Sequence, residues 1–114
     1  MRIYCAHSSG FDYHTEFYNL IKASPVFANH EFILPHAHGA EPVHSKTAIA
    51  EADFVLAEVS FPSTGLGIEL GWAEAANTPI WAIHKADKSI STSIKLIAKE
   101  VIPYQSLDDV LKRL

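Results

Sequence analysis

Glu69 is the residue whose position most directly suggests chemistry. An apolar run, Phe54 to Val59, predicts a buried strand, and the small polar segment from Ser60 to Ser63 follows it. Gly65 and Gly67 suit a tight turn into a helix that would carry Glu69 close to its start. A strand, a polar loop and a helix N-terminus together form an anion site. A carboxylate beside such a site suits chemistry on a sugar that carries an anionic group.

The bulk composition limits the function classes. The 114 residues fit one domain, residues 1–114, and 48% of them are hydrophobic. The net charge of −4 and the absence of a basic stripe argue against polymeric nucleic acid as a partner. The single Cys5 excludes an intramolecular disulfide framework. No apolar stretch is long enough to cross a bilayer and no signal-peptide pattern follows Met1, so we expect no membrane partner and a cytoplasmic location.

Strand and helix patterns alternate along the whole chain. Short apolar runs predict strands over residues 2–6, 31–34, 53–59, 79–83 and 101–104. Helical spacing and capping residues predict helices over 12–23, 43–52, 66–77 and 91–99, and from Ser106 onward. Five β-α units favour an α/β fold: a doubly wound, flavodoxin-like parallel sheet of order 2-1-3-4-5 with helices on both faces.

This fold predicts where a ligand would bind. In open parallel sheets, ligands lie outside the carboxyl ends of the strands, at the switch point between strands 1 and 3. The loops expected there are His7-Ser8-Ser9-Gly10 and the segment from Ser60 to Gly67. Both are rich in small polar residues, so the fold and the composition indicate the same place.

The segment 52–73, ADFVLAEVSFPSTGLGIELGWA, resembles the signature of the nucleoside 2-deoxyribosyltransferase superfamily. It is most similar to the branch of 2′-deoxynucleoside 5′-monophosphate N-hydrolases, and residues 3–8, IYCAHS, are similar to that branch's first strand and loop. The likeness spans most of the chain, but only the central segment is highly specific. The resemblance implies the doubly wound fold, no cofactor or metal, a nucleotide or nucleoside as the small-molecule substrate, and a homodimer or higher oligomer.

The resemblance also implies roles for individual residues. Glu69 matches the catalytic glutamate, and Tyr4 matches a first-strand tyrosine beside it. Ser8, Ser63 and Ser93 match serines that hold the 5′-phosphate. Their neighbours Ser9, Gly10, Gly65 and Gly67 are further candidate substrate-binding residues. Ser93 matches a serine that reaches the site of the neighbouring subunit.

The sequence departs from the family pattern at two points. Ser45 occupies the position of a second carboxylate, and His44 and Glu41 nearby do not match it. The first loop also lacks an arginine that many members carry. His44 is one candidate for a substitute acid.

Each site residue also has a purely structural interpretation. Glu69 could complement the helix dipole, the serines could be ordinary N-caps, and the glycines could serve a plain turn. His36, His38 and His44 are too sparse to favour a metal over a solvated loop. If Glu69 is a nucleophile it must be ionised, and we expect the helix N-terminus to lower its pKa.

Three functions remain open at this stage. The first is an N-glycosidase that hydrolyses the base–sugar bond of (2′-deoxy)nucleoside 5′-monophosphates through Glu69. The second is a 2-deoxyribosyltransferase, in which a nucleobase replaces water as the acceptor. The third is a non-catalytic nucleotide-binding module. The serine-rich loops favour the N-glycosidase, because it needs a phosphate site. Ser45 at the position of the second carboxylate favours the non-catalytic module.

Overall fold

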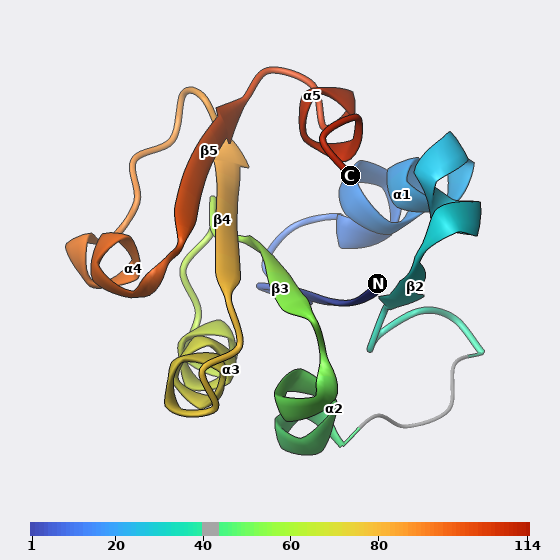
Figure 1. The fold of residues 1–114 in the computed structure, drawn as a ribbon. Helices are drawn as coiled ribbons and strands as arrows, with labels where there is room; N and C mark the ends of the chain where they lie inside the picture. Colours follow the sequence, from blue (N-terminus) through green and yellow to red (C-terminus); the bar gives the residue numbers. More distant parts are fainter. Residues whose placement is uncertain (40–43) are drawn as a thin grey trace.

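The computed structural model describes residues 1–39 and 44–114, and a five-stranded parallel sheet forms its centre (Figure 1). The strands lie in the order β2-β1-β3-β4-β5, as the sequence predicts. Neighbouring strands pair in parallel throughout. Their bounds are Arg2–His7 for β1, Glu31–Ile33 for β2, Phe54–Glu58 for β3, Ile80–Lys85 for β4 and Glu100–Tyr104 for β5.

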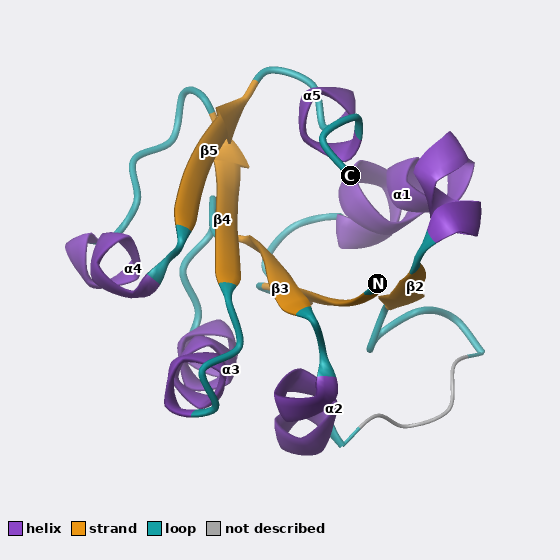
Figure 2. Ribbon diagram, in the orientation of Figure 1, coloured by secondary structure: helices purple, strands orange, loops and turns teal. Residues whose placement is uncertain are grey.

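Helices cover both faces of this sheet (Figure 2). Their bounds are Asn19–Ala23 for α1, Ser45–Glu51 for α2, Thr64–Ala75 for α3, Thr92–Ile97 for α4 and Asp108–Leu111 for α5. A π-helical turn, His14–Tyr18, leads into α1, and a 3-10 helix, Pro25–Asn29, follows it. Asp12 accepts a hydrogen bond from the Thr15 amide at 3.3 Å, in agreement with its predicted capping role.

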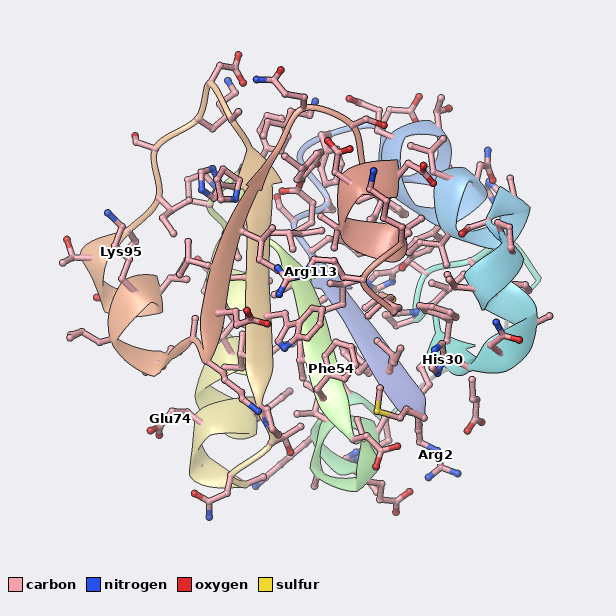
Figure 3. The ribbon with its side chains drawn as sticks, turned by 45° about the horizontal axis from the view of Figure 1, so that its top comes forward. Arg2, His30, Phe54, Glu74, Lys95 and Arg113 are labelled. Carbon is pink, nitrogen blue, oxygen red and sulfur yellow. The ribbon has the colours of Figure 1, made fainter. Side chains whose placement is uncertain are left out.

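Alternating side chains of the strands build a separate core on each face. On one face Ile3 and Cys5 of β1 pack with α1 and α5, and Phe54 points into the same core (Figure 3). Arg113 folds back over this face, with its guanidinium 5.2 Å from the centre of the Trp81 ring. On the other face Tyr4 packs with α2, α3 and α4.

The second core fixes the helix that carries Glu69. Leu66 and Leu70 of α3 and Ile49 of α2 are almost fully buried against the sheet. Burial of each such side chain stabilises the fold by about 1.5–3 kcal/mol. Helix α3 therefore has a fixed rotation, which determines the direction of each of its polar residues.

The predicted start of the helix that carries Glu69 needs correction. Helix α3 begins at Thr64, two residues before the predicted start, because the Ser63 side chain already caps it by accepting from the Leu66 amide at 3.2 Å. Residues 40–43, which include the first residue of the predicted helix 43–52, lie outside the described residues. Among the described residues, no helix is long and apolar enough to span a membrane.

Candidate active site

Three side chains meet between β1, α2 and α3. The Tyr4 hydroxyl donates to Oε2 of Glu69 and lies 2.9 Å from Oγ of Ser45. A phenol has a single proton, so the Ser45 hydroxyl supplies the proton for its own contact with Tyr4. The predicted contact of Tyr4 with Glu69 is therefore present in the structure, and Ser45 joins it. Tyr4 is fully buried, whereas Glu69 remains partly accessible to a ligand.

The environment of Glu69 opposes its ionisation overall. Burial raises the pKa of Glu69, and this outweighs the hydrogen bond from Tyr4, the charge of His36 and the hydroxyl of Ser45, all of which lower it. The expected lowering by the helix N-terminus is wrong. Because α3 starts at Thr64, Glu69 lies beyond its first turn, where the effect of the helix dipole has faded. Tyr4 is thus a main stabiliser of the ionised carboxylate.

The glycines next to Ser63 do not form the predicted turn. Gly65 and Gly67 both lie inside α3, and the chain reverses in the segment 60–63 before it. The space beside both glycines is open, because a Cβ added at either one would meet no atom from outside its own stretch of helix within 4 Å. Their lack of a side chain leaves the first turn of α3 accessible, which suits the approach of an anion to the helix N-terminus.

A cavity of about 580 Å³ opens beside the N-terminal half of α3, on the flank that faces α4. Its rim carries Ser63, Ser89, Ser91 and Ser93. Its floor is apolar and is formed by Val59, Pro62, Leu66, Leu70, Ile90, Ile94 and Ile97. The structure therefore brings two of the predicted phosphate serines, Ser63 and Ser93, to one cavity. Ser91 caps α4 by accepting from the Ser93 amide at 3.2 Å, which leaves the Ser93 hydroxyl exposed.

The first loop is tied more tightly to the protein than its composition suggests. Ser8 is only 2% exposed, and its Oγ accepts from the Gly10 amide at 2.9 Å. A Cβ added at Gly10 would lie 3.2 Å from the same oxygen, a tight contact. Ser9 is exposed beside them. Ser9 therefore presents an accessible hydroxyl, whereas the buried Ser8 hydroxyl stabilises the conformation of the loop.

His7 has a structural role at the end of β1. Its Nδ1 lies 2.8 Å from the Ser8 carbonyl oxygen and its Nε2 lies 2.6 Å from the Tyr18 hydroxyl. Burial lowers the pKa of His7 to about 4, so the ring is neutral at pH 7. Both ring nitrogens are occupied by these contacts, which supports the interpretation of His7 as a partner of strand-end groups.

Several of the other histidines lie in ring contacts with aromatic or histidine neighbours. His38 stacks on His14 with ring centres 4.0 Å apart, and the ring centre of His36 lies 5.6 Å from that of His7. Nδ1 of His44 faces the Thr47 hydroxyl at 3.3 Å. Within residues 1–39 and 44–114 no three His, Cys, Asp or Glu side chains are arranged to hold a metal ion. Glu41 lies outside the described residues.

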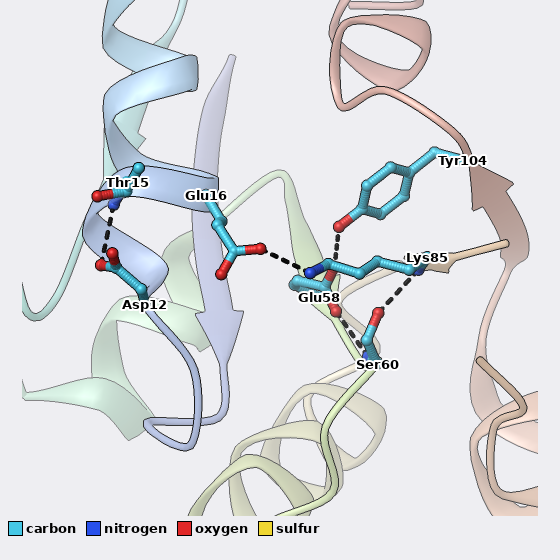
Figure 4. Close-up of polar contacts among 7 residues, drawn as sticks. All are labelled: Asp12, Thr15, Glu16, Glu58, Ser60, Lys85 and Tyr104. Carbon is cyan, nitrogen blue, oxygen red and sulfur yellow. Dashed lines mark hydrogen bonds and ion pairs between the residues drawn. The ribbon is translucent and has the colours of Figure 1, made fainter. Parts of the chain in front are cut away.

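The buried acid Glu58 is not among the site residues predicted from the sequence. Glu58, at the end of β3, is 1% exposed and accepts from the Ser60 amide at 2.6 Å and from the Tyr104 hydroxyl (Figure 4). Its signal in the sequence is the one charge inside the apolar run 54–59. Because β3 alternates, Glu58 points to the face of α1 and α5, opposite Tyr4 and Glu69.

Helix α3 carries both the Ser63 cap at its N-terminus and the Glu69 carboxylate. Ser63 at the N-terminus of α3 and Glu69 lie six residues apart, about 9 Å along the helix axis. Glu69 faces α2 and β1, whereas the serine-rimmed cavity lies on the flank toward α4, and Ser63 stands at the helix end between them.

Two curated proteins are similar to parts of this chain. No protein-family model matches the chain. A protein of Syntrophotalea carbinolica is 56% identical over 36 residues, and one of Thermofilum pendens is 31% identical over 71 residues. Both carry the name "Putative 2′-deoxynucleoside 5′-phosphate N-hydrolase 1". The matches cover 32% and 58% of this chain, but only a quarter and a half of the lengths of these relatives (25% and 50%).

Solved structures share the fold over the full chain. The CMP N-glycosidase of Clostridium botulinum superposes with a TM-score of 0.70 and 20% identity, covering 99% of this chain and 97% of that one. A 2-deoxyribosyltransferase of Bacillus psychrosaccharolyticus gives a TM-score of 0.65 at 18% identity, covering 97% and 90%. The two curated relatives carry the name of the N-hydrolase branch that the sequence resembles, and the solved structures show that the chain has the same fold.

Proposed function

We propose that this chain is an N-glycosidase that hydrolyses the base–sugar bond of (2′-deoxy)nucleoside 5′-monophosphates, with Glu69 as the nucleophile. The contact between the Tyr4 hydroxyl and the Glu69 carboxylate carries the proposal. It fixes a partly accessible acid on the same helix that Ser63 caps. The names of the relatives support the same activity.

In the first step the Glu69 carboxylate attacks C1′ of the sugar. A C–O bond forms, the C1′–N bond breaks, and its electron pair leaves with the base, which takes up a proton. In the second step water attacks C1′, the glycosyl–Glu69 bond breaks, and the carboxylate is restored. Tyr4 and Ser45 hold the carboxylate in one orientation through both steps.

The phosphate would bind at the N-terminus of α3. The free amides of the first helical turn and the hydroxyl of Ser63 offer hydrogen bonds to it. Ser93 from a neighbouring subunit would add a further hydroxyl, and the first loop with Ser8, Ser9 and Gly10 would lie on the other side. No metal or cofactor is needed for this chemistry, and a homo-oligomer is part of the proposal because of the role implied for Ser93.

The test compares nucleotides with nucleosides. The protein is incubated with each 2′-deoxynucleoside and ribonucleoside 5′-monophosphate and with the matching nucleosides, with and without an added nucleobase, and free base is followed by chromatography. We expect base release from monophosphates without an acceptor. Product that forms only when an acceptor base is present would assign a transferase, and binding without turnover would assign a nucleotide-binding module.

A matched pair of variants tests the nucleophile. Glu69→Gln should lower turnover by about a thousandfold or more, the scale at which the loss of a nucleophile acts. Glu74→Gln makes the same change on the same helix at an exposed position and should leave turnover unchanged. Full activity in Glu69→Gln would remove Glu69 from the mechanism.

A further inference from the structure

Glu58 is a buried carboxylate whose hydrogen bonds come from two neutral donors. It accepts from the Ser60 amide and the Tyr104 hydroxyl, whereas the nearby Lys85 ammonium pairs with Glu16 at 2.6 Å (Figure 4). A buried carboxylate costs free energy that neutral donors offset only in part, and an apolar side chain would end this strand at a lower cost. Its presence therefore calls for a role beyond packing.

The two hydrogen bonds of Glu58 fix the root of the loop that leads to α3. Oε1 holds the Ser60 amide at 2.6 Å, and the Ser60 Oγ in turn accepts from the Lys85 amide at 2.8 Å. Tyr104 joins the network from β5, and burial beside Glu58 raises the pKa of Tyr104, so its hydroxyl stays a donor. The start of the loop is thus anchored to three neighbouring strands, β3, β4 and β5.

This loop carries one half of the proposed active site. Ser63 follows Ser60 by three residues, caps α3 and lines the serine-rimmed cavity. Glu69, the other half, is held from the opposite face of the sheet by Tyr4. The two halves therefore depend on two separate tyrosine–glutamate pairs, one on each face.

We propose that Glu58 and Tyr104 are positioning residues that hold the loop 60–63, and with it the phosphate-binding end of α3, in place relative to Glu69. The inference rests on the proposed function. Loss of the hydrogen bond between Tyr104 and Glu58 would displace the proposed phosphate-binding N-terminus of α3. It would leave the Tyr4–Glu69 contact intact. It should therefore weaken the binding of monophosphates without slowing the chemical step.

Tyr104→Phe is the first test, because it removes only the hydroxyl that donates to Glu58. We expect the KM for a monophosphate to rise about three- to tenfold, the loss that one hydrogen bond produces, while kcat changes less than twofold. The KM of the matching nucleoside, which has no phosphate, should stay the same. Glu58→Gln keeps an oxygen for the Ser60 amide and should raise the KM less than Glu58→Leu does.

Thr78→Val is the matched control. Thr78 is buried at the other end of the sheet, and its hydroxyl donates to the Ile49 carbonyl oxygen at 3.0 Å. Like Tyr104→Phe, this variant removes one buried hydroxyl and should lower the stability of the protein. Because Thr78 does not contact the loop 60–63, the KM for monophosphates should stay unchanged.

Hydrogen exchange gives a second measurement that does not depend on turnover. In Tyr104→Phe the amides of Ser60 and Leu66 should exchange faster, whereas the amide of Val110 in α5 should not change. A fall in kcat with an unaltered KM, or faster exchange spread evenly over the chain, would overturn the positioning role. If the unaltered protein releases no base from any monophosphate, the proposed function fails, and the exchange rates still decide whether the pair holds the loop.

Discussion

At the scale of single residues, the chemistry depends on keeping one carboxylate ionised in a partly buried place. Burial raises the pKa of Glu69, and the Tyr4 hydroxyl is the first of the contacts that lower it again. A carboxyl group whose folded-state pKa is raised binds its proton more tightly in the folded protein. Its contribution to stability is present at low pH and is lost as pH rises through the folded-state pKa. Glu69 thus serves reactivity at the expense of stability.

This balance predicts the pH dependence of Tyr4→Phe. The variant removes the donor to Glu69, so the pKa of Glu69 rises further and the acid limb of the kcat/KM profile moves to higher pH. At neutral pH kcat/KM should fall about ten- to a hundredfold, as expected for a hydrogen bond to a charged group. Tyr104→Phe should not move this limb, since its partner is Glu58. An unchanged limb in Tyr4→Phe would contradict the proposed role of Tyr4.

At the scale of elements, α3 combines a structural cap with a proposed ligand site. Ser63 accepts from the Leu66 amide, so a substitution at this position affects both the helix and the phosphate. Aspartate caps a helix as well as serine does but carries a negative charge. Substitution of Ser63 by aspartate and by alanine therefore separates the two roles.

We expect Ser63→Ala mainly to lower the stability and Ser63→Asp mainly to raise the KM for monophosphates. Ser63→Ala loses the cap and should lower the unfolding free energy by about 1 kcal/mol, with a modest rise in the KM for monophosphates. Ser63→Asp should keep the stability but raise that KM at least about tenfold, because its carboxylate repels the phosphate. Thermal unfolding and steady-state kinetics measure both effects. Equal KM values for Ser63→Asp and the unaltered protein would place the phosphate elsewhere.

The elements are largely predictable from the sequence because each of them follows from local patterns. The apolar run before Ser60 is long enough to indicate a buried strand, and the alternation of strands and helices leads to the sheet order that the structure has. The predicted start of α3 is two residues late because Gly65 and Gly67 suggest a turn. In the structure, the cap at Ser63 outweighs the low helix propensity of glycine.

Contacts between distant residues are less predictable. The pairing of Tyr4 with Glu69 follows from the resemblance, whereas the pairing of Tyr104 with Glu58 has no local signal, because 46 residues separate them. The predicted sign of the pKa shift of Glu69 is also wrong, because burial depends on packing that the sequence does not display. Ser45 stands out in the sequence only as a missing carboxylate, yet its hydroxyl contacts Tyr4.

At the scale of the whole molecule, the proposed site indicates a role for a second subunit. Ser93 and Glu69 lie on opposite flanks of α3, one facing α4 and the other facing α2 and β1. A helix with its side chains is about 10 Å across, so it separates the two groups within one chain. Exposed apolar side chains lie on the same helices: Ile68 is 50% exposed on α3, and Leu96 is 83% exposed on α4. These features favour the expectation that Ser93 serves the site of a neighbouring subunit.

Mixed subunits test this expectation. Glu69→Gln lacks the nucleophile and Ser93→Ala lacks the serine, so each variant alone should hydrolyse monophosphates poorly. When the two are co-expressed, a hetero-oligomer contains one site with an intact Glu69 and an intact Ser93 from the partner. If Ser93 acts between subunits, that site should recover the KM of the unaltered protein, with kcat per subunit reduced in proportion to the number of such sites. If Ser93 acts within its own chain, every site lacks one group and the mixture recovers nothing. Sedimentation of the same samples shows whether the subunits associate.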